Sequence, residues 1–314
     1  MPSPRPSSAS RPSCAPPLPN ERSSSRNMQP RHEVALGPHT VGDGHPVSIV
    51  AELGVNHLGD PGRMLEMIDA AVDAGADLLK FQTYSAESRY DRLTNPKADE
   101  FIENLARWEL PRDVEARMWE HAAGRGATVF TSPFDPDSAA FAHELGSVGF
   151  KLAAFEVVNL SLVRALAGYG KPVVISRGMC SYDELDTAIE ILREGGCPVV
   201  LLHCISSYPV QRHDSNLAMI RALRERYPWP VGHSDHTRGC DLPPLAVACG
   251  ANMIEKHFTV NPKLRESDNP FSVTPGELRE IVFRVRQVES WLGSGEITRI
   301  PAEEFMWSFR RKTA

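Results

Sequence analysis

An α/β fold, a closed (β/α)8 barrel of the TIM type with a short N-terminal hairpin, is predicted by three observations. Eight short, β-branched apolar runs recur between residues 47 and 259. The runs are apolar on both faces, which is typical of strands buried in a parallel sheet. Helical patterns lie between them, and eight evenly spaced strand–helix units in about 230 residues favour a closed barrel over an open doubly wound sheet.

The strands are predicted directly from these runs. Ahead of them, residues 33–46 carry turn signals at Gly37-Pro38 and Gly42-Asp43-Gly44, which predict a small hairpin before the barrel. The eight predicted strands span residues 47–54, 78–84, 127–134, 149–155, 172–178, 199–206, 230–235 and 253–259.

The helices are predicted from apolar stripes and from capping residues. In residues 61–74, Met64, Ile68, Ala71 and Val72 form one stripe, and Gly75 ends the helix. Three further helices begin after a capping side chain, namely 136–145 after Asp135, 160–168 after Asn159 and 182–194 after Ser181. The remaining predicted helices span residues 113–124, 215–226, 240–249 and 275–292.

Composition divides the chain into a tail, residues 1–32, a barrel with its hairpin, residues 33–300, and a linker-like end, residues 301–314. The tail is rich in Pro, Ser and Arg and is predicted to be disordered. The net charge is −6, with +4 on residues 1–31 and therefore −10 on the rest, which argues against a nucleic-acid partner. The sequence contains no membrane-span pattern, and its six cysteines lack CxxC spacing, so a cytoplasmic protein is predicted.

Polar side chains stand at the carboxyl ends of nearly all the predicted strands, where (β/α)8 barrels hold their active sites. Burying several of them without partners would cost roughly 2–7 kcal/mol apiece, so we expect them to line one pocket. Lys80, Lys151 and Arg177, with hydroxyls at Thr131, Ser176 and Ser234, are predicted to form an anion site. Other strand-end residues are Glu52, Asn56, Gln82, Ser206 and Tyr208.

Two histidines in this set predict a metal site. His236 and His257 follow adjacent predicted strands, so both imidazoles could reach one divalent ion, with water in the open positions. Glu52 and Asp268 are predicted to supply acid/base or hydroxyl-binding groups. An acidic protein with a basic, metal-bearing pocket points to a small anionic substrate.

The ordered motifs resemble those of the sialic acid synthase family, the N-acetylneuraminate synthase-like enzymes. The likeness runs from about residue 33 to residue 312. The motifs that carry it are AELGVNHLGD (51–60), GADLLKFQTY (75–84), TSPFD (131–135), KLAAFEVVN (151–159), KPVVISRGM (171–179), LHCISSYP (202–209), GHSDHT (232–237) and IEKHFT (254–259).

This resemblance implies a metal-dependent condensation of phosphoenolpyruvate with an aldose to a 3-deoxy-2-keto sugar acid, with phosphate leaving by C–O cleavage. It implies manganese or magnesium on His236 and His257. Glu52, Tyr208 and Asp268 fall near the sugar aldehyde. The positions implied to hold phosphoenolpyruvate are Lys80, Thr131, Lys151, Ser176, Ser206 and Ser234.

The sequence departs from the family pattern at several positions. Ala154 replaces a serine of the anion site, and Arg177 replaces a threonine and is predicted to compensate as a phosphate contact. Ser206 stands where sialic-acid-forming members often carry asparagine. The chain ends at SFRRKTA (308–314), which resembles the linker to the family's C-terminal antifreeze-like domain; that domain is lacking. The resemblance implies a homodimer, and the departures leave open an acceptor other than N-acetylmannosamine.

Two other functions fit the same residues. One is a different metal-assisted barrel reaction, such as that of an aldolase or lyase. The other is a non-catalytic homologue that binds phosphoenolpyruvate, which Ala154 and Arg177 favour and the intact Lys80 and Lys151 oppose.

Overall fold

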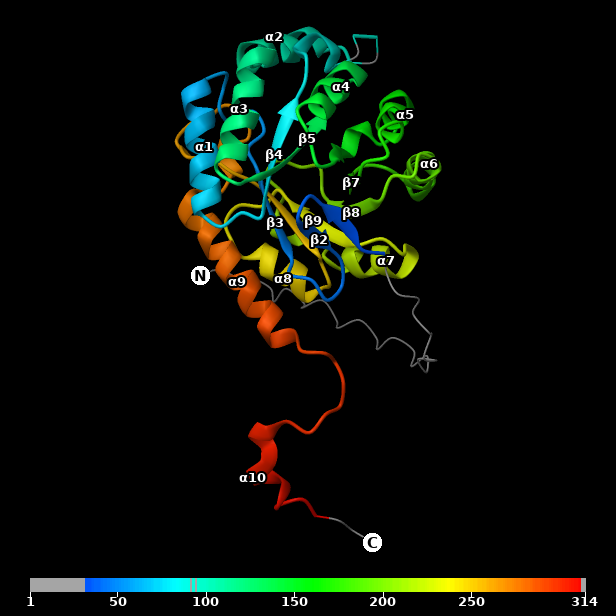
Figure 1. The fold of residues 1–314 in the computed structure, drawn as a ribbon, viewed down its shortest axis with the longest axis vertical. Helices are drawn as coiled ribbons and strands as arrows, with labels where there is room; N and C mark the ends of the chain where they lie inside the picture. The colour runs from blue at the N-terminus through cyan, green and yellow to red at the C-terminus, as the bar shows by residue number, and fades with distance from the viewer. Residues whose placement is uncertain (1–31, 91, 94, 312–314) are drawn as a thin grey trace, which may run out of the picture. The chain divides into compact units, whose positions relative to one another are not determined.

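Eight parallel strands close into a barrel in the computed structural model, which describes residues 32–311 except 91 and 94 (Figure 1). The strands follow one another around the barrel in chain order, and the last pairs with the first, with His257 opposite Glu52. The predicted fold is confirmed. The strands are β3 (Ser48–Glu52), β4 (Leu78–Thr83), β5 (Thr128–Pro133), β6 (Phe150–Leu152), β7 (Val173–Arg177), β8 (Val199–Cys204), β9 (Val231–Asp235) and β10 (Met253–His257).

The predicted hairpin is also present and covers the amino-terminal end of the barrel. It consists of β1 (Val34–Leu36) and β2 (His39–Val41), which pair antiparallel. Its buried side chains belong to the same apolar cluster as the interior residues of the barrel strands. That cluster contains Val34, Leu36, Val41, Val50, Leu78, Phe130, Val174, Val200, Leu202 and Met253.

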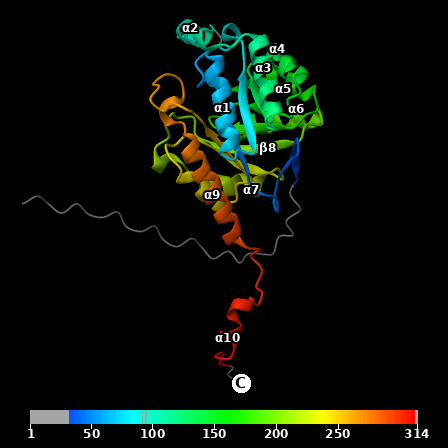
Figure 2. The same cartoon turned by 60° about the vertical axis from the view of Figure 1, so that its left-hand side comes forward.

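Helices surround the strands (Figures 1 and 2). Each predicted helix is present, and α9 has the predicted bounds. The helices of the barrel are α1 (Pro61–Asp73), α2 (Ala98–Trp108), α3 (Arg112–Gly124), α4 (Pro136–Glu144), α5 (Leu160–Ala167), α6 (Tyr182–Glu194), α7 (Ala218–Arg226), α8 (Leu242–Ala248) and α9 (Pro275–Leu292).

Capping side chains start several of these helices as predicted. Asp135 accepts a hydrogen bond from the backbone N–H of Ser138, and Asn159 accepts one from that of Leu162. Ser181 forms a reciprocal capping box with Glu184. These bonds satisfy backbone donors that a helix leaves unpaired in its first turn, which fixes where each helix begins.

Two helix predictions need correction. The buried stripe of α1 contains Met67, which the prediction omits, whereas Val72 is only partly buried. The sequence analysis also misses α2. Its N-cap residue, Lys97, makes no side-chain capping bond, and its buried stripe is short. Helix α2 lies beyond the carboxyl end of β4 (Figure 1), on the side where the active site is expected.

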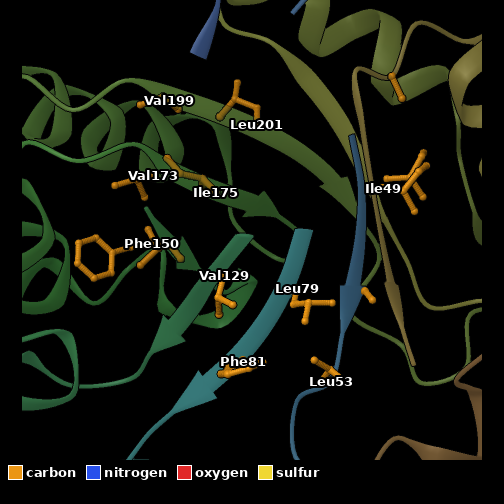
Figure 3. Close-up of a cluster of buried hydrophobic side chains, with 14 of the residues drawn as sticks. Ile49, Leu53, Leu79, Phe81, Val129, Phe150, Val173, Ile175, Val199 and Leu201 are labelled. Carbon is orange, nitrogen blue, oxygen red and sulfur yellow. The ribbon is translucent and has the colours of Figure 1, made fainter. Parts of the chain in front are cut away.

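Side chains alternate between the two faces of each barrel strand. One set points outward and packs against the helices; Ile49, Leu79, Val129, Ile175 and Leu201 belong to it (Figure 3). The other set points inward and fills the barrel above the hairpin. This alternation decides which residue at each strand end can reach the interior.

The ends of the chain add little to the barrel. The short turns η5 (Pro301–Glu303) and α10 (Glu304–Trp307) contact each other within the predicted linker-like segment. The predicted disordered tail lies outside the described residues, apart from residue 32. In the described part of the chain, no helix has both the length and the hydropathy needed to cross a membrane.

Candidate active site

A ring of eight inward-facing side chains lies directly above the apolar filling of the barrel. Each strand contributes one residue, and seven of the eight are polar or charged. Six of the eight stand two positions after an apolar residue of the layer below, whereas Lys151 and Ser234 stand two positions after Gly149 and Gly232. All eight are buried. They are Glu52 (β3), Lys80 (β4), Ser132 (β5), Lys151 (β6), Ser176 (β7), Cys204 (β8), Ser234 (β9) and Glu255 (β10).

The ring forms the base of a cavity of about 420 Å³ at the carboxyl ends of the strands. All the ring residues except Glu52 line it, so residues from strands far apart in the sequence meet at one place. A second part of the lining comes from the loop after β4, from α2 and from the ends of β5 and β6. It consists mainly of aromatic side chains with one guanidinium: Arg89, Tyr90, Phe101, Trp108, Phe134 and Phe155.

Lys80 is held by neighbours on both sides. Its Nζ lies 2.8 Å from Glu52 Oε2 and donates a hydrogen bond of 3.1 Å to Ser132 Oγ. Gln82 Nε2 donates to the other Glu52 oxygen, at 2.7 Å. The carboxylates of Glu255 and Glu52 raise the pKa of Lys80 against the opposing effect of burial, so its ammonium is charged at neutral pH.

Lys151 approaches the same point from β6, two strands further around the ring than β4. Its Nζ donates a 2.6 Å hydrogen bond to Ser176 Oγ and lies 3.7 Å from Glu255 Oε1. That same oxygen is 4.0 Å from Lys80 Nζ and accepts a 2.9 Å bond from Ser234 Oγ. The two ammonium groups thus converge on one small region, together with two hydroxyls, which is an arrangement that attracts a phosphate or a carboxylate.

The acidic residues of the site differ in their tendency to hold a proton. Burial raises the pKa of Glu52 to about 7, although Lys80 lowers it. Burial likewise raises the pKa of Asp268, which lines the cavity, to about 6. Burial would raise the pKa of Glu255 too, but Lys151 and Lys80 lower it below its usual value. Glu255 is therefore ionised, whereas Glu52 and Asp268 titrate near neutral pH.

The two predicted metal ligands lie side by side. The rings of His236 and His257 have centroids 5.4 Å apart, and Tyr208 packs on His236 at 4.3 Å. His236 Nδ1 donates to Ile205 O at 2.9 Å, which leaves the lone pair of the neutral ring on Nε2, 3.5 Å from Ser234 Oγ. Burial lowers the pKa of both histidines, so both are neutral.

These two imidazoles fit a divalent ion with few protein ligands. His257 Nδ1 is buried without a hydrogen-bond partner among the described residues, and Asp268 Oδ2 is 3.5 Å away. Neutral imidazole is the form that binds metals. In the part of the chain that the structure describes, no group of three or more His, Cys, Asp or Glu side chains could enclose an ion, so water or substrate would have to complete the coordination.

Most of the predicted site residues meet in this cavity. Those that line it are Lys80, Gln82, Lys151, Ser176, Tyr208, Ser234, His236 and Asp268. Glu52 lies behind Lys80 rather than on the lining, and His257 lies behind His236 and Tyr208. Both contact residues that do line the cavity.

Thr131 and Arg177 do not line the cavity, because they follow inward-facing residues and so point outward. Thr131 Oγ1 shares a 2.9 Å hydrogen bond with Thr83 Oγ1 on the outer face of the sheet. The guanidinium of Arg177 lies 5.9 Å from the ring centroid of Tyr182 on α6. On β5 and β7, the hydroxyls that line the cavity belong to Ser132 and to Ser176, which is itself one of the predicted site residues.

Asn56 and Ser206 are also absent from the lining. Asn56 Nδ2 donates to Phe258 O at 2.9 Å and to Ser272 Oγ at 2.8 Å, so it ties two loops together. Ser206 Oγ lies only 2.5 Å from the point where a Cβ on Gly178 would be, and Gly178 leaves room for it. Asn56 therefore supports the loops at the rim of the barrel from outside the cavity, whereas Ser206 Oγ is buried without a hydrogen-bond partner among the described residues.

Lining residues outside the predicted site include Ser132, Glu255 and Arg89, whose side chains are polar or charged. Ser132 and Glu255 each stand two residues after an apolar side chain that points into the barrel, Phe130 and Met253 respectively. The alternation of side chains along a strand could therefore have identified them. Arg89 lies in a loop without periodicity, and no sequence signal marks it.

The fold and this cavity together define a (β/α)8 barrel protein with a strand-end cavity lined by two buried lysines. More particularly, the chain belongs to the NeuB family, whose model matches residues 67–297. This confirms the resemblance to sialic acid synthases.

Named relatives are similar over most of the chain. An N,N'-diacetyllegionaminic acid synthase of Legionella pneumophila is 36% identical, covering 79% of this chain and 74% of the relative. A pseudaminic acid synthase of Campylobacter jejuni is also 36% identical, covering 80% and 76%. The crystal structure of an N-acetylneuraminic acid synthetase from Leptospira borgpetersenii with citrate has a TM-score of 0.83 and 36% identity, covering 89% of this chain and 96% of that one. The predicted enzyme class is thereby confirmed.

Proposed function

We propose that this chain condenses phosphoenolpyruvate with an aldose, giving a 3-deoxy-2-keto sugar acid and inorganic phosphate. The observation that carries the proposal is the convergence of Lys80 and Lys151 on one point of a single cavity, each with a serine hydroxyl. Two relatives named as an N,N'-diacetyllegionaminic acid synthase and a pseudaminic acid synthase support it.

The ring residues would bind and orient phosphoenolpyruvate. This substrate carries a phosphate and a carboxylate on adjacent carbons, and two ammonium groups with nearby hydroxyls suit a ligand with two anionic groups. Glu255, held between the lysines, keeps both side chains pointed into the cavity. Fixing the enolpyruvate in this way would set its C3 against the aldehyde and supply the orientation that a bimolecular step needs.

The reaction also requires proton movement near the sugar. As C3 of the enolpyruvate bonds to the aldehyde carbon, the aldehyde oxygen gains a proton, and the water that adds at C2 loses one before phosphate leaves with C–O cleavage. Asp268 lines the cavity, and with a pKa of about 6 it can exchange a proton with the sugar. Glu52, behind Lys80, positions that ammonium through their 2.8 Å contact.

His236 and His257 would hold a divalent ion, manganese or magnesium, at the sugar side of the cavity. When bound, such an ion acts as a Lewis acid that polarises the aldehyde. Tyr208, which packs on His236, would fix the orientation of that imidazole.

Phosphate release tests the proposal. The protein, stripped of metal with a chelator, is incubated with phosphoenolpyruvate and a panel of aldoses, with and without manganese or magnesium. We expect phosphate only when the aldose, phosphoenolpyruvate and the ion are all present. His236→Ala should abolish turnover, whereas His213→Ala, which changes an exposed histidine outside the cavity, should not.

The same assay separates the other functions. With ¹⁸O in the bridging position of phosphoenolpyruvate, C–O cleavage places the label in phosphate. Label retained in the organic product would indicate a different barrel reaction. Calorimetric binding of phosphoenolpyruvate without turnover for any aldose would indicate a non-catalytic homologue and refute the proposal.

A further inference from the structure

Arg89 is a buried cation in the wall of the cavity that the proposed reaction does not use. It follows the turn η1 (Ala86–Ser88) in the loop after β4, and its side chain is only 9% exposed. Its guanidinium carbon lies 3.1 Å from the ring centroid of Phe134 and 4.8 Å from that of Phe155. Packing on two aromatic faces fixes the plane of the guanidinium without using its N–H donors.

The donors of Arg89 are incompletely satisfied. Its Nε and Nη1 are buried and have no hydrogen-bond partner among the described residues. The carboxylate paired with it, Glu156, has Oε1 3.7 Å from Nη1, which is too long for a hydrogen bond. The other oxygen of Glu156 accepts a 2.8 Å bond from Asn159 Nδ2.

Arg89 nevertheless carries a full charge. Burial lowers its pKa to about 10, well above neutral pH. A buried, charged donor without a partner is costly, and such groups usually have a functional explanation. A purely structural arginine in this place would be expected to form close hydrogen bonds with Glu156, and it does not.

The position of Arg89 relative to the lysines indicates what it could bind. Lys80 and Lys151 belong to the ring at the base of the cavity, whereas Arg89 belongs to the aromatic wall contributed by the loop after β4. The two anionic groups of phosphoenolpyruvate are matched by the two lysines. A third cation in the same cavity is therefore available for the second substrate.

We propose that Arg89 binds an anionic substituent, a phosphate or a carboxylate, carried by the aldose at the end away from its aldehyde. The inference rests on the proposed condensation and adds the class of acceptor to it. A planar guanidinium offers paired N–H donors that match two oxygens of such a group, which a single sugar hydroxyl cannot do.

Matched pairs of acceptors test this proposal. Phosphate release from phosphoenolpyruvate is measured with mannose and mannose 6-phosphate, N-acetylmannosamine and its 6-phosphate, and arabinose and its 5-phosphate. Mannuronate, compared with mannose, distinguishes a carboxylate from a phosphate. The variants are Arg89→Gln, Arg89→Lys and, as a control, Arg92→Gln, which changes an exposed arginine of the same loop that is absent from the lining.

The proposal predicts that the wild type has a kcat/KM at least tenfold higher for the charged member of a pair. Arg89→Gln should lower kcat/KM for that member about 10- to 100-fold, the effect of losing a hydrogen bond to a charged group. It should change kcat/KM for the neutral member and the KM for phosphoenolpyruvate less than threefold, which also shows that the variant folds. The kcat/KM of Arg89→Lys for the charged member should fall between the values for the wild type and Arg89→Gln. Arg92→Gln should have the kcat/KM of the wild type for both members.

Equal losses for charged and neutral acceptors, or no preference in the wild type, would overturn the proposal. If the wild type turns over none of these aldoses, the proposed reaction fails, and calorimetry decides the role of Arg89 separately. Mannose 6-phosphate, mannuronate and mannose are then titrated into the wild type and Arg89→Gln. Tighter binding of a charged sugar that is lost in Arg89→Gln supports the proposal, and equal affinities refute it.

Discussion

Replacing Lys256 with methionine removes one half of a buried ion pair beside the two histidines. Lys256 Nζ lies 2.7 Å from Asp235 Oδ2 and also donates to Thr237 O, and both charged side chains are at most 1% exposed. The pair joins neighbouring strands, since Asp235 lies opposite Lys256 in the β9–β10 ladder. Methionine keeps most of the volume but leaves the Asp235 carboxylate buried without its cation.

The structure sets the size of the effect. Removing one partner of a buried pair costs about 3–5 kcal/mol. Asp235 Oδ1 keeps two hydrogen bonds of 2.8 Å from the N–H and the hydroxyl of Thr237, which favours the lower end of that range. A loss of about 3 kcal/mol corresponds to a decrease in Tm of roughly 6–12 °C for a domain of this size.

The loss should depend on pH in a defined direction. Burial alone would raise the pKa of Asp235, but Lys256 lowers it below its usual value. In the wild type, this depressed pKa contributes stability above about pH 4, which is lost as the pH falls further. In Lys256→Met, burial is opposed only by weaker interactions, such as the hydrogen bonds from Thr237, and the carboxyl should take up a proton more readily. The difference in Tm between variant and wild type should therefore shrink from pH 7 to pH 5.

Thermal unfolding followed by circular dichroism measures these differences. Lys263→Met, at an exposed lysine, should leave Tm within 2 °C of the wild type. The double variant Asp235→Asn/Lys256→Met should be more stable than Lys256→Met, because it no longer buries an unpaired charge. A Tm for Lys256→Met within 2 °C of the wild type, or a double variant less stable than the single one, would refute the reasoning.

Four further substitutions have defined outcomes. Arg177→Gln should leave the KM for phosphoenolpyruvate within twofold of the wild type, since the Arg177 side chain lies outside the cavity lining. Ala154→Ser adds a hydroxyl to the lining and should lower that KM. Steady-state kinetics would contradict both expectations if Arg177→Gln alone changed the KM. Thr274→Ala removes the capping box of α9 and should cost about 1 kcal/mol, measured by urea unfolding. Burial raises the pKa of Glu52 to about 7, so the free energy of unfolding should fall as the pH rises from 4.5 to 7. Glu52→Gln should flatten this pH dependence. The same slope in the variant and in the wild type would contradict the assignment of this pH dependence to Glu52.

The sequence predicts the barrel well because its signals are local. A strand such as Val199–Cys204 is recognisable as a continuous apolar run, and α6 is recognisable from Ser181 at its start. Both depend on residues within one element. The helix α2 is missed because Lys97 provides no capping signal and the buried stripe is short.

The site is predicted less completely, for two physical reasons. The first is strand parity. Ser176 and Arg177 are adjacent and cannot both face the cavity, and comparison with the interior residue Val174 would have selected Ser176. The second is the path of loops. Arg89 reaches the cavity because Phe134 and Phe155 hold its guanidinium, and contacts between such distant residues leave no periodic trace in the sequence.

The hairpin of β1 and β2 determines the end of the barrel from which a ligand can enter the cavity. Its side chains and the apolar filling close the amino-terminal end of the barrel. A molecule bound at Lys80 and Lys151 therefore arrives and departs through the opposite mouth, past the aromatic wall. In the proposed reaction, phosphoenolpyruvate would lie deeper in the cavity than the sugar. The two substrates would therefore bind in a fixed order, with phosphoenolpyruvate first and the sugar last.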